Sequence, residues 1–121
     1  MMGNKGGVSI SFRLNDKLLQ FVCCHLHSGL EGVKKRNDDV EDIMNQMVYR
    51  TSSKRVNKVA SSVSVDIVSQ PLPDVLIFLG DLNYRVNGYK PSILQCIKQN
   101  RYDILIDSEQ LGIEKTLGNV P

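Results

Sequence analysis

The chain has 121 residues, with 15 Lys and Arg against 13 Asp and Glu, so its formal net charge is +2. Its length fits one domain at most, and a content of 41% hydrophobic and 23% charged residues is typical of a globular protein. So small a net charge argues against a nucleic-acid partner, and the absence of Trp disfavours a stacking platform for single-stranded nucleic acid. No apolar run approaches the ~18 residues that a membrane span needs.

The first predicted element is a strand, because apolar and polar residues alternate from Val8 to Leu14. Turn-forming residues follow at Asn15-Asp16-Lys17, and Leu18–Leu26 is a second apolar run. The two segments together predict an antiparallel hairpin. The second strand has apolar side chains on both faces, so we expect it to be the more deeply buried of the two.

An amphipathic helix is predicted from Glu31 to about Arg50, because the apolar residues of this segment fall at helical spacing. They are Val40, Ile43, Met44, Met47 and Val48. Residues 51–70 hold six Ser and show little periodicity, which indicates a Ser-rich insertion or a connecting segment.

The short apolar run Val75–Leu79, bounded by Pro and Gly, predicts a central strand. A loop is expected at Gly80–Gly88, and Pro91 at a first-turn position predicts the start of a helix. The segment Tyr102–Leu111 predicts one or two further helical turns. This order of elements indicates an α/β or α+β protein with helices packed on a sheet.

The three cysteines, Cys23, Cys24 and Cys96, are odd in number, and the opening Met1–Lys5 does not have the form of a signal peptide. Both observations favour reduced thiols in a cytoplasmic protein.

Polar residues follow the apolar run Val75–Leu79 and could carry chemistry. Asp81 and Asn83 are two residues apart, so in extended backbone they would project to the same side. A carboxylate can accept a proton from water or hold a metal, and an amide can donate to a developing negative charge. Arg85 could add a positive charge for a phosphate. The alternative is an ordinary turn after a strand, which Asp and Asn also favour.

His25 ends the other apolar strand, and a lone histidine in that place is more often structural than catalytic. His25 and His27 could share one face as zinc ligands, but Cys23 and Cys24 cannot both point the same way from a strand. We therefore do not expect a zinc site.

The Gly-rich opening Gly3–Gly7 does not match a Walker loop, because its glycines precede a strand. It could present backbone N–H groups and Lys5 to a phosphate, and an ordinary tight turn is an equal alternative. The basic cluster Lys34-Lys35-Arg36 is followed by several acidic residues, which predicts a solvated helix face.

Four segments, taken in order, are more specific than any one of these features. They are Gly3–Ile10, Phe21–Gly29, Arg36–Val40 and Phe78–Val86. As a set they resemble the inositol polyphosphate 5-phosphatase family of the endonuclease/exonuclease/phosphatase superfamily, with His-Leu-x-Ser-Gly closest to its plant-type branch. The resemblance extends to Asp107–Leu111, which is similar to a family Asp-Gln-Leu segment. It implies an α/β fold: a partial four-layer α/β sandwich (DNase I-like), with the hairpin plus a central strand and packed helices.

The resemblance also implies a role for individual side chains. Asp81 would orient or deprotonate the attacking water, Asn83 would contact the scissile phosphate, and His25 would stabilise its charge. Asn4, Lys5 and Arg85 would lie near the substrate phosphates. The family's acidic metal ligand lies on an upstream strand and its Ser-Asp-His element lies downstream. We therefore expect no metal ligand within residues 1–121, which would be a partial catalytic domain that is inactive alone.

The resulting hypothesis is a Mg²⁺-dependent phosphatase fragment that acts on the 5-phosphate of inositol polyphosphates or phosphoinositides. Attack of water on a phosphate dianion needs a metal to neutralise charge and a carboxylate to direct the water. A nuclease or sphingomyelinase-like hydrolase would share His25, Asp81 and Asn83, but Tyr84-Arg85 and the Gly-rich opening disfavour it. A non-catalytic pseudo-phosphatase is the other alternative. The preference for soluble or lipid substrate, the contact with a membrane surface and the oligomeric state stay open.

Overall fold

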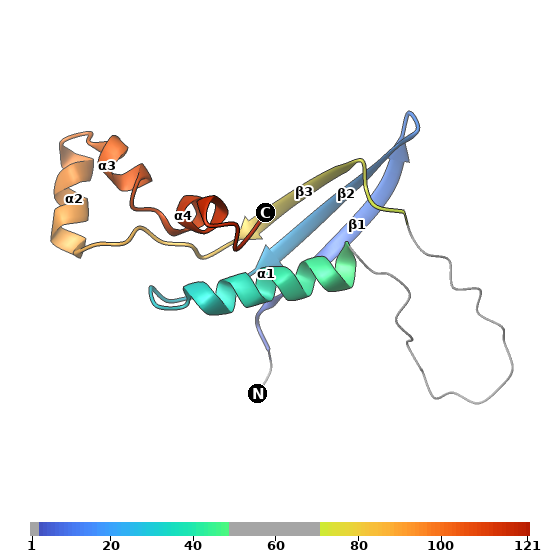
Figure 1. The fold of residues 1–121 in the computed structure, drawn as a ribbon, viewed down its shortest axis with the longest axis horizontal. Helices are drawn as coiled ribbons and strands as arrows, with labels where there is room; N and C mark the ends of the chain where they lie inside the picture. The colour runs from blue at the N-terminus through green and yellow to red at the C-terminus, as the bar shows by residue number, and fades with distance from the viewer. Residues whose placement is uncertain (1–2, 49–70) are drawn as a thin grey trace, which may run out of the picture.

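The computed structural model describes residues 3–48 and 71–121, and Figure 1 shows how they are arranged. The strands are β1 (Gly6–Leu14), β2 (Lys17–His25) and β3 (Val75–Asp81). The helices are α1 (Val33–Met47), α2 (Lys90–Lys98), α3 (Tyr102–Ile106) and α4 (Gln110–Thr116). The predicted insertion at residues 51–70 lies outside the described residues.

The three strands form one mixed sheet with β2 in the middle. β1 and β2 form the predicted antiparallel hairpin, and its two turn residues, Asn15 and Asp16, both have positive φ angles, of 47° and 66°. β3 runs parallel to β2. The segment that predicted a central strand thus lies at the edge of the described sheet, and the central place belongs to β2.

Helix α1 covers one face of the sheet with the predicted apolar stripe (Figure 1). The buried apolar residues are Val22, Cys24, Leu26, Val40, Ile43, Met44, Val48 and Val120, with Leu76 and Phe78 of β3 packed beside them. No side chain caps the helix N-terminus and no acidic residue occupies its first turn. Packing against the sheet is therefore the main source of its stability.

The opposite face of the described sheet is apolar and open to solvent. Alternate residues of each strand point to it, namely Val8, Ile10, Phe12, Leu14, Leu19, Phe21, Val75, Ile77 and Leu79. Val8 is 71% exposed and Ile10 is 64% exposed. The strand Leu18–Leu26 is therefore deeply buried only on the face under α1, in contrast to the burial on both faces that its sequence predicts. A contiguous apolar patch of this kind is rare on a stable monomer.

The C-terminal helices form an arm beside the sheet, with α4 nearest to it and α2 and α3 farther away (Figure 1). Pro91 lies in the first turn of α2, as predicted. Glu109 caps α4 by accepting from the N–H groups of Leu111 and Gly112. A short antiparallel bridge between Val86 and Glu109 joins the start of α4 to the loop after β3. None of the helices within the described ranges is long and apolar enough to cross a membrane.

We predict that residues 1–121 by themselves fold poorly, because the open face exposes apolar side chains and unpaired strand edges. They should bind a hydrophobic dye and show no cooperative thermal transition by circular dichroism. Replacing Val8 and Ile10 by Thr, which keeps the preference for strand, should reduce the dye signal. A cooperative transition above ~50 °C without dye binding would contradict the prediction.

Candidate functional site

The site is built on the register of the two parallel strands. His25, the last residue of β2, lies opposite Asp81, the last residue of β3. The N–H of Leu26 donates to the carbonyl of Asp81 over 3.0 Å, so the pairing continues to the strand ends. Gly80 has a φ of 120°, and a Cβ there would overlap the backbone of Cys24. Glycine at this position is therefore required for β3 to approach β2 so closely.

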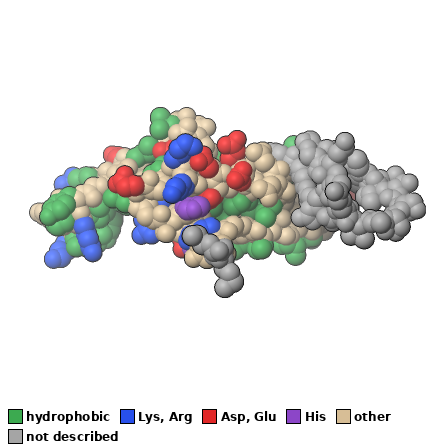
Figure 2. Space-filling view, turned by 90° about the horizontal axis from the view of Figure 1, so that it is seen from below, with side chains coloured by type: hydrophobic (Ala, Val, Ile, Leu, Met, Phe, Trp, Pro, Cys, Tyr) green, Lys and Arg blue, Asp and Glu red, His purple; other side chains and the backbone are tan. Residues whose placement is uncertain are grey.

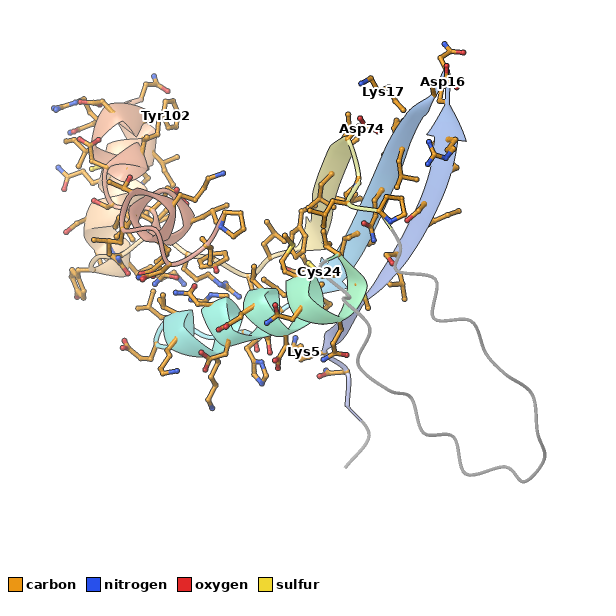
Figure 3. All side chains as sticks on the ribbon, turned by 45° about the vertical axis from the view of Figure 1, so that its right-hand side comes forward. Lys5, Asp16, Lys17, Cys24, Asp74 and Tyr102 are labelled. Atoms are coloured by element: carbon orange, nitrogen blue, oxygen red, sulfur yellow. The ribbon has the colours of Figure 1, made fainter. Side chains whose placement is uncertain are left out.

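Lys5, His25 and Asp81 meet at this edge of the sheet. The ammonium group of Lys5 lies 2.6 Å from Nε2 of His25, and the same nitrogen lies 3.7 Å from Oδ2 of Asp81. The side chains of His25 and Asp81 are 46% and 64% exposed, so solvent reaches both. Figure 3 places Lys5 at the end of the sheet opposite to the Lys17–Asp74 ion pair.

The contact with Lys5 fixes the tautomer of a neutral His25. When Lys5 donates to Nε2, this nitrogen is an acceptor, and the ring proton must lie on Nδ1. When the ring is protonated, Nε2–H can instead face the carboxylate of Asp81. The space-filling view shows a histidine next to basic side chains, with carboxylates nearby (Figure 2).

Asn83 is held close to Asp81 by the loop itself. Its backbone N–H donates to Oδ1 of Asp81 over 3.1 Å, and its φ of 57° is left-handed. The predicted projection from extended backbone is therefore wrong, because a turn of the kind that Asp and Asn favour brings the two residues together. The same turn that follows β3 therefore brings the candidate site residues Asp81 and Asn83 together.

Both ends of the Asn83 amide are occupied. Its Nδ2 donates to the carbonyl of Leu26 over 3.0 Å, and its Oδ1 accepts from Nη2 of Arg85 over 2.9 Å. Nε of Arg85 also donates to the Asn83 carbonyl over 3.3 Å. Five of the six candidate residues thus form one connected cluster, which we call the strand-end cluster: Lys5, His25, Asp81, Asn83 and Arg85. Asn4 is exposed beside Lys5.

Arg36 is the clearest departure from the sequence prediction. Its side chain is fully buried instead of lying on a solvated helix face. The guanidinium donates to the carbonyls of His27 and Gly29 over 3.1 and 2.7 Å and to Oε1 of Gln110 over 2.6 Å. It also lies 5.1 Å from the ring centroid of Tyr84. Burial lowers the pKa of Arg36, and these contacts offset part of the cost of burying its charge.

His27 has a partner that no pattern in the sequence indicates. Its backbone N–H and its Nδ1 both lie within hydrogen-bond distance of Oδ2 of Asp39, at 2.9 and 2.7 Å. His25 and His27 therefore face different partners. Across residues 3–48 and 71–121, no three His, Cys, Asp or Glu side chains gather closely enough to hold a metal ion.

Two further ionisable groups near the site are held in their neutral forms. Burial raises the pKa of Tyr84 to about 12, and its hydroxyl donates to Oδ1 of Asn37 over 2.7 Å. Burial likewise raises the pKa of Cys24 to about 11, and its thiol donates to the carbonyl of Leu79. All three cysteines are free. Cys24 is thus a structural thiol and not a nucleophile.

The sequence profile of Endonuclease/Exonuclease/phosphatase family 2 matches residues 1–120, and the chain belongs to this family. Its fold is that of the solved inositol polyphosphate 5-phosphatase domain of SPsynaptojanin, in complex with inositol (1,4)-bisphosphate and calcium ion. The TM-score is 0.77 at 27% sequence identity, covering 98% of this chain and 31% of that chain. The predicted DNase I-like α/β fold class is confirmed.

The similar sequences are inositol polyphosphate 5-phosphatases. The chain is 33% identical, over 98% of its length, to type I inositol polyphosphate 5-phosphatase 13 and to type IV inositol polyphosphate 5-phosphatase 9, both of Arabidopsis thaliana. It is 34% identical, over 94% of its length, to phosphatidylinositol 3,4,5-trisphosphate 5-phosphatase 2A of Danio rerio. It spans 12%, 27% and 8% of these three relatives. The predicted resemblance to this family is confirmed.

We predict that Arg36→Met destabilises the protein by ~2 kcal/mol, because two loop carbonyls and the Gln110 amide lose their buried donor. The measurement is urea unfolding of the protein over its full native length. Lys35→Met is the matched control, since Lys35 is the neighbouring residue of α1 and is exposed. Equal free energies of unfolding for the two variants would show that the Arg36 contacts contribute nothing.

Proposed function

We propose that the protein carrying this chain is a metal-dependent phosphatase that removes the 5-phosphate of inositol polyphosphates or phosphoinositides by attack of water. The strand-end cluster is the observation that supports this proposal most strongly. It combines an exposed carboxylate, an amide and three groups able to carry positive charge at the edge where two parallel strands end. The SPsynaptojanin domain, which shares the fold, binds inositol (1,4)-bisphosphate.

Asp81 is the residue that handles the attacking water in this proposal. One carboxylate oxygen accepts from the backbone of Asn83, which fixes the direction of the group. The other oxygen faces the solvent and His25, where it can orient a water molecule or accept its proton. The backbone contact thus leaves one oxygen for chemistry.

Asn83 and Arg85 are the residues that bind the scissile phosphate. One N–H of the Asn83 amide is used on Leu26, and the second can donate to a phosphate oxygen. Arg85 uses Nε and Nη2 on Asn83, so Nη1 remains for a phosphate. An amide and a guanidinium already held in place add little reorganisation when negative charge develops.

Lys5 and His25 supply positive charge on the other side of Asp81. An N–H at Nε2 of His25 can donate to a phosphate oxygen and so stabilise charge in the transition state. Lys5, 2.6 Å away, can move from the ring nitrogen to a phosphate oxygen. Asn4, the neighbour of Lys5 in the Gly-rich opening, can contact the same phosphate.

Mg²⁺ is the cofactor in this proposal, and the described residues do not form its site alone. In this proposal Asp81 acts on the attacking water, and the amide oxygen of Asn83 is occupied by Arg85. Mg²⁺ in such enzymes is typically held by one or two carboxylates, waters and substrate phosphates. A bound cation would neutralise phosphate charge, and its acidic ligand would come from outside residues 1–121, as the family resemblance implies.

Another hydrolase of the same superfamily is the alternative function. A panel of 5-phosphorylated inositols, phosphoinositide vesicles, DNA and sphingomyelin separates the possibilities by rate of turnover. The relatives favour the inositol substrates. With a phosphoinositide as substrate, the protein would act from the cytoplasm at a membrane surface.

We predict that Asp81→Asn lowers kcat for phosphate release by ~10²-fold or more in the protein over its full native length, because the variant cannot accept the proton of water. Asp16→Asn is the matched control: Asp16 lies at the hairpin tip, at the far end of the sheet (Figure 3). Activity of Asp81→Asn within a factor of three of the control would sink this mechanism.

We also predict that activity disappears in EDTA and returns with added Mg²⁺, because phosphate oxygens and carboxylates are hard ligands that suit this ion. Unchanged circular dichroism in EDTA is the control for unfolding. Residues 1–121 by themselves should release no phosphate, since the family resemblance places the acidic metal ligand and the Ser-Asp-His element outside them. Full activity in chelator would rule out the metal-dependent mechanism.

A further inference from the structure

Gln110, the first residue of α4, is a buried amide whose hydrogen-bonding capacity is fully used. It is 2% exposed. Its Oε1 accepts from Nη2 of Arg36 and from the backbone N–H of Arg85, over 2.6 and 2.9 Å. Its Nε2 donates to the carbonyl of Leu30 and to Oδ1 of Asn87, over 3.0 and 2.8 Å. An amide has two lone pairs and two N–H groups, so this orientation satisfies all four and the flipped one would satisfy none.

Two loops meet at this single side chain. The loop after β2 is held through Leu30 and through Arg36, which itself binds the carbonyls of His27 and Gly29. The loop after β3 is held through Arg85 and Asn87. Both loops begin at the candidate site, because they follow directly after His25, the last residue of β2, and Asp81, the last residue of β3.

The contact with Arg85 is made from both sides of its peptide backbone. Gln110 accepts the Arg85 N–H with its side chain and donates its own backbone N–H to the Arg85 carbonyl over 2.9 Å. With its backbone fixed, Arg85 directs its guanidinium onto Asn83. Asn83 in turn donates to Leu26 at the end of β2. Gln110 is thus connected to Asn83 through one residue.

We propose that Gln110 is a positioning residue of the phosphatase site: it sets the place of Arg85, and through Arg85 that of Asn83, relative to the end of β2. This inference rests on the proposed function. The oxygen Oε1 is the essential atom, because it accepts the Arg85 N–H. The nitrogen Nε2 donates to Leu30 and Asn87 and not to Arg85, so it has a smaller share in the reaction.

Gln110→Ala and Gln110→Glu separate positioning from simple core filling. Alanine removes every side-chain contact, whereas Glu keeps an oxygen for Arg85 and Arg36 and loses only the two N–H donors. If Gln110 only filled the core, Glu at this position should be no better than Ala. The carboxylate of Glu would face the Leu30 carbonyl and the Asn87 oxygen, which is unfavourable for a buried charge. Gln95→Ala, at an exposed position of α2, is the control.

The first measurement is amide hydrogen exchange in the protein over its full native length. In Gln110→Ala the Arg85 amide should exchange ~10-fold faster or more, while the Asn87 amide, bonded to the Ser108 carbonyl, should change less than about threefold. Gln110→Glu should keep the protection of Arg85. An Arg85 exchange rate in Gln110→Ala equal to that of Gln95→Ala would overturn the proposal.

The second measurement is steady-state phosphate release from a 5-phosphorylated inositol with Mg²⁺. Gln110→Ala should lower kcat by ~10-fold or more with a smaller change in KM, because a misplaced Asn83 affects the transition state most. Gln110→Glu should recover at least about threefold of the lost kcat. Faster Arg85 exchange with kcat within threefold of the control would also overturn the proposal. Absence of turnover in the unsubstituted protein would instead contradict the proposed function, and the exchange rates would still show whether Gln110 holds Arg85.

Discussion

The parallel pairing of β2 with β3 is the constraint on which the rest of the site depends. Its register places His25 opposite Asp81, and the bond from Leu26 to the Asp81 carbonyl extends the pairing beyond the last strand residue. The pairing requires Gly80, because a side chain there would overlap the backbone of Cys24. Parallel strands deliver their carboxyl ends to the same edge, where functional groups of two loops can meet.

Two buried polar side chains connect the loops at this edge. Arg36 and Gln110 are both buried, and between them they bind carbonyl groups or amides of the loops after β2 and β3. A buried cation without a carboxylate partner is costly, and here the carbonyl groups and the ring of Tyr84 offset part of that cost. Because each such bond is directional, the network specifies one arrangement of the loops in a way that an apolar cluster could not.

The sequence predicted the elements well where the signal is local. The alternation in Val8–Leu14 and the helical spacing that starts at Val40 are properties of a few adjacent residues, and the hairpin and α1 follow from them. The turn residues Asn15 and Asp16 were equally informative. The place of β3 at the edge of the described sheet was not predictable, because a run that is apolar on both faces does not reveal how many neighbours it has.

The strand-end cluster was predicted as a set, but its geometry was not. Asn83 takes a left-handed conformation, stabilised by its bond to Asp81, instead of the extended backbone that the prediction assumed. Arg36 looked solvated because its neighbours in the sequence are charged, whereas its partner Gln110 lies 74 residues away. The sequence contains both residues within the family-like segments, yet no local pattern indicates that they touch. The long-range contacts therefore had to come from the structure.

The central claim is that the ends of β2 and β3 form the phosphate-binding part of a catalytic site. The most direct test is a crystal structure of the Asp81→Asn variant, over the full native length of the protein, with a 5-phosphorylated inositol bound. We expect the 5-phosphate within hydrogen-bond distance of His25 and Asn83, with the Arg85–Asn83 contact preserved. A ligand bound elsewhere, with the strand-end cluster in contact only with solvent, would contradict it.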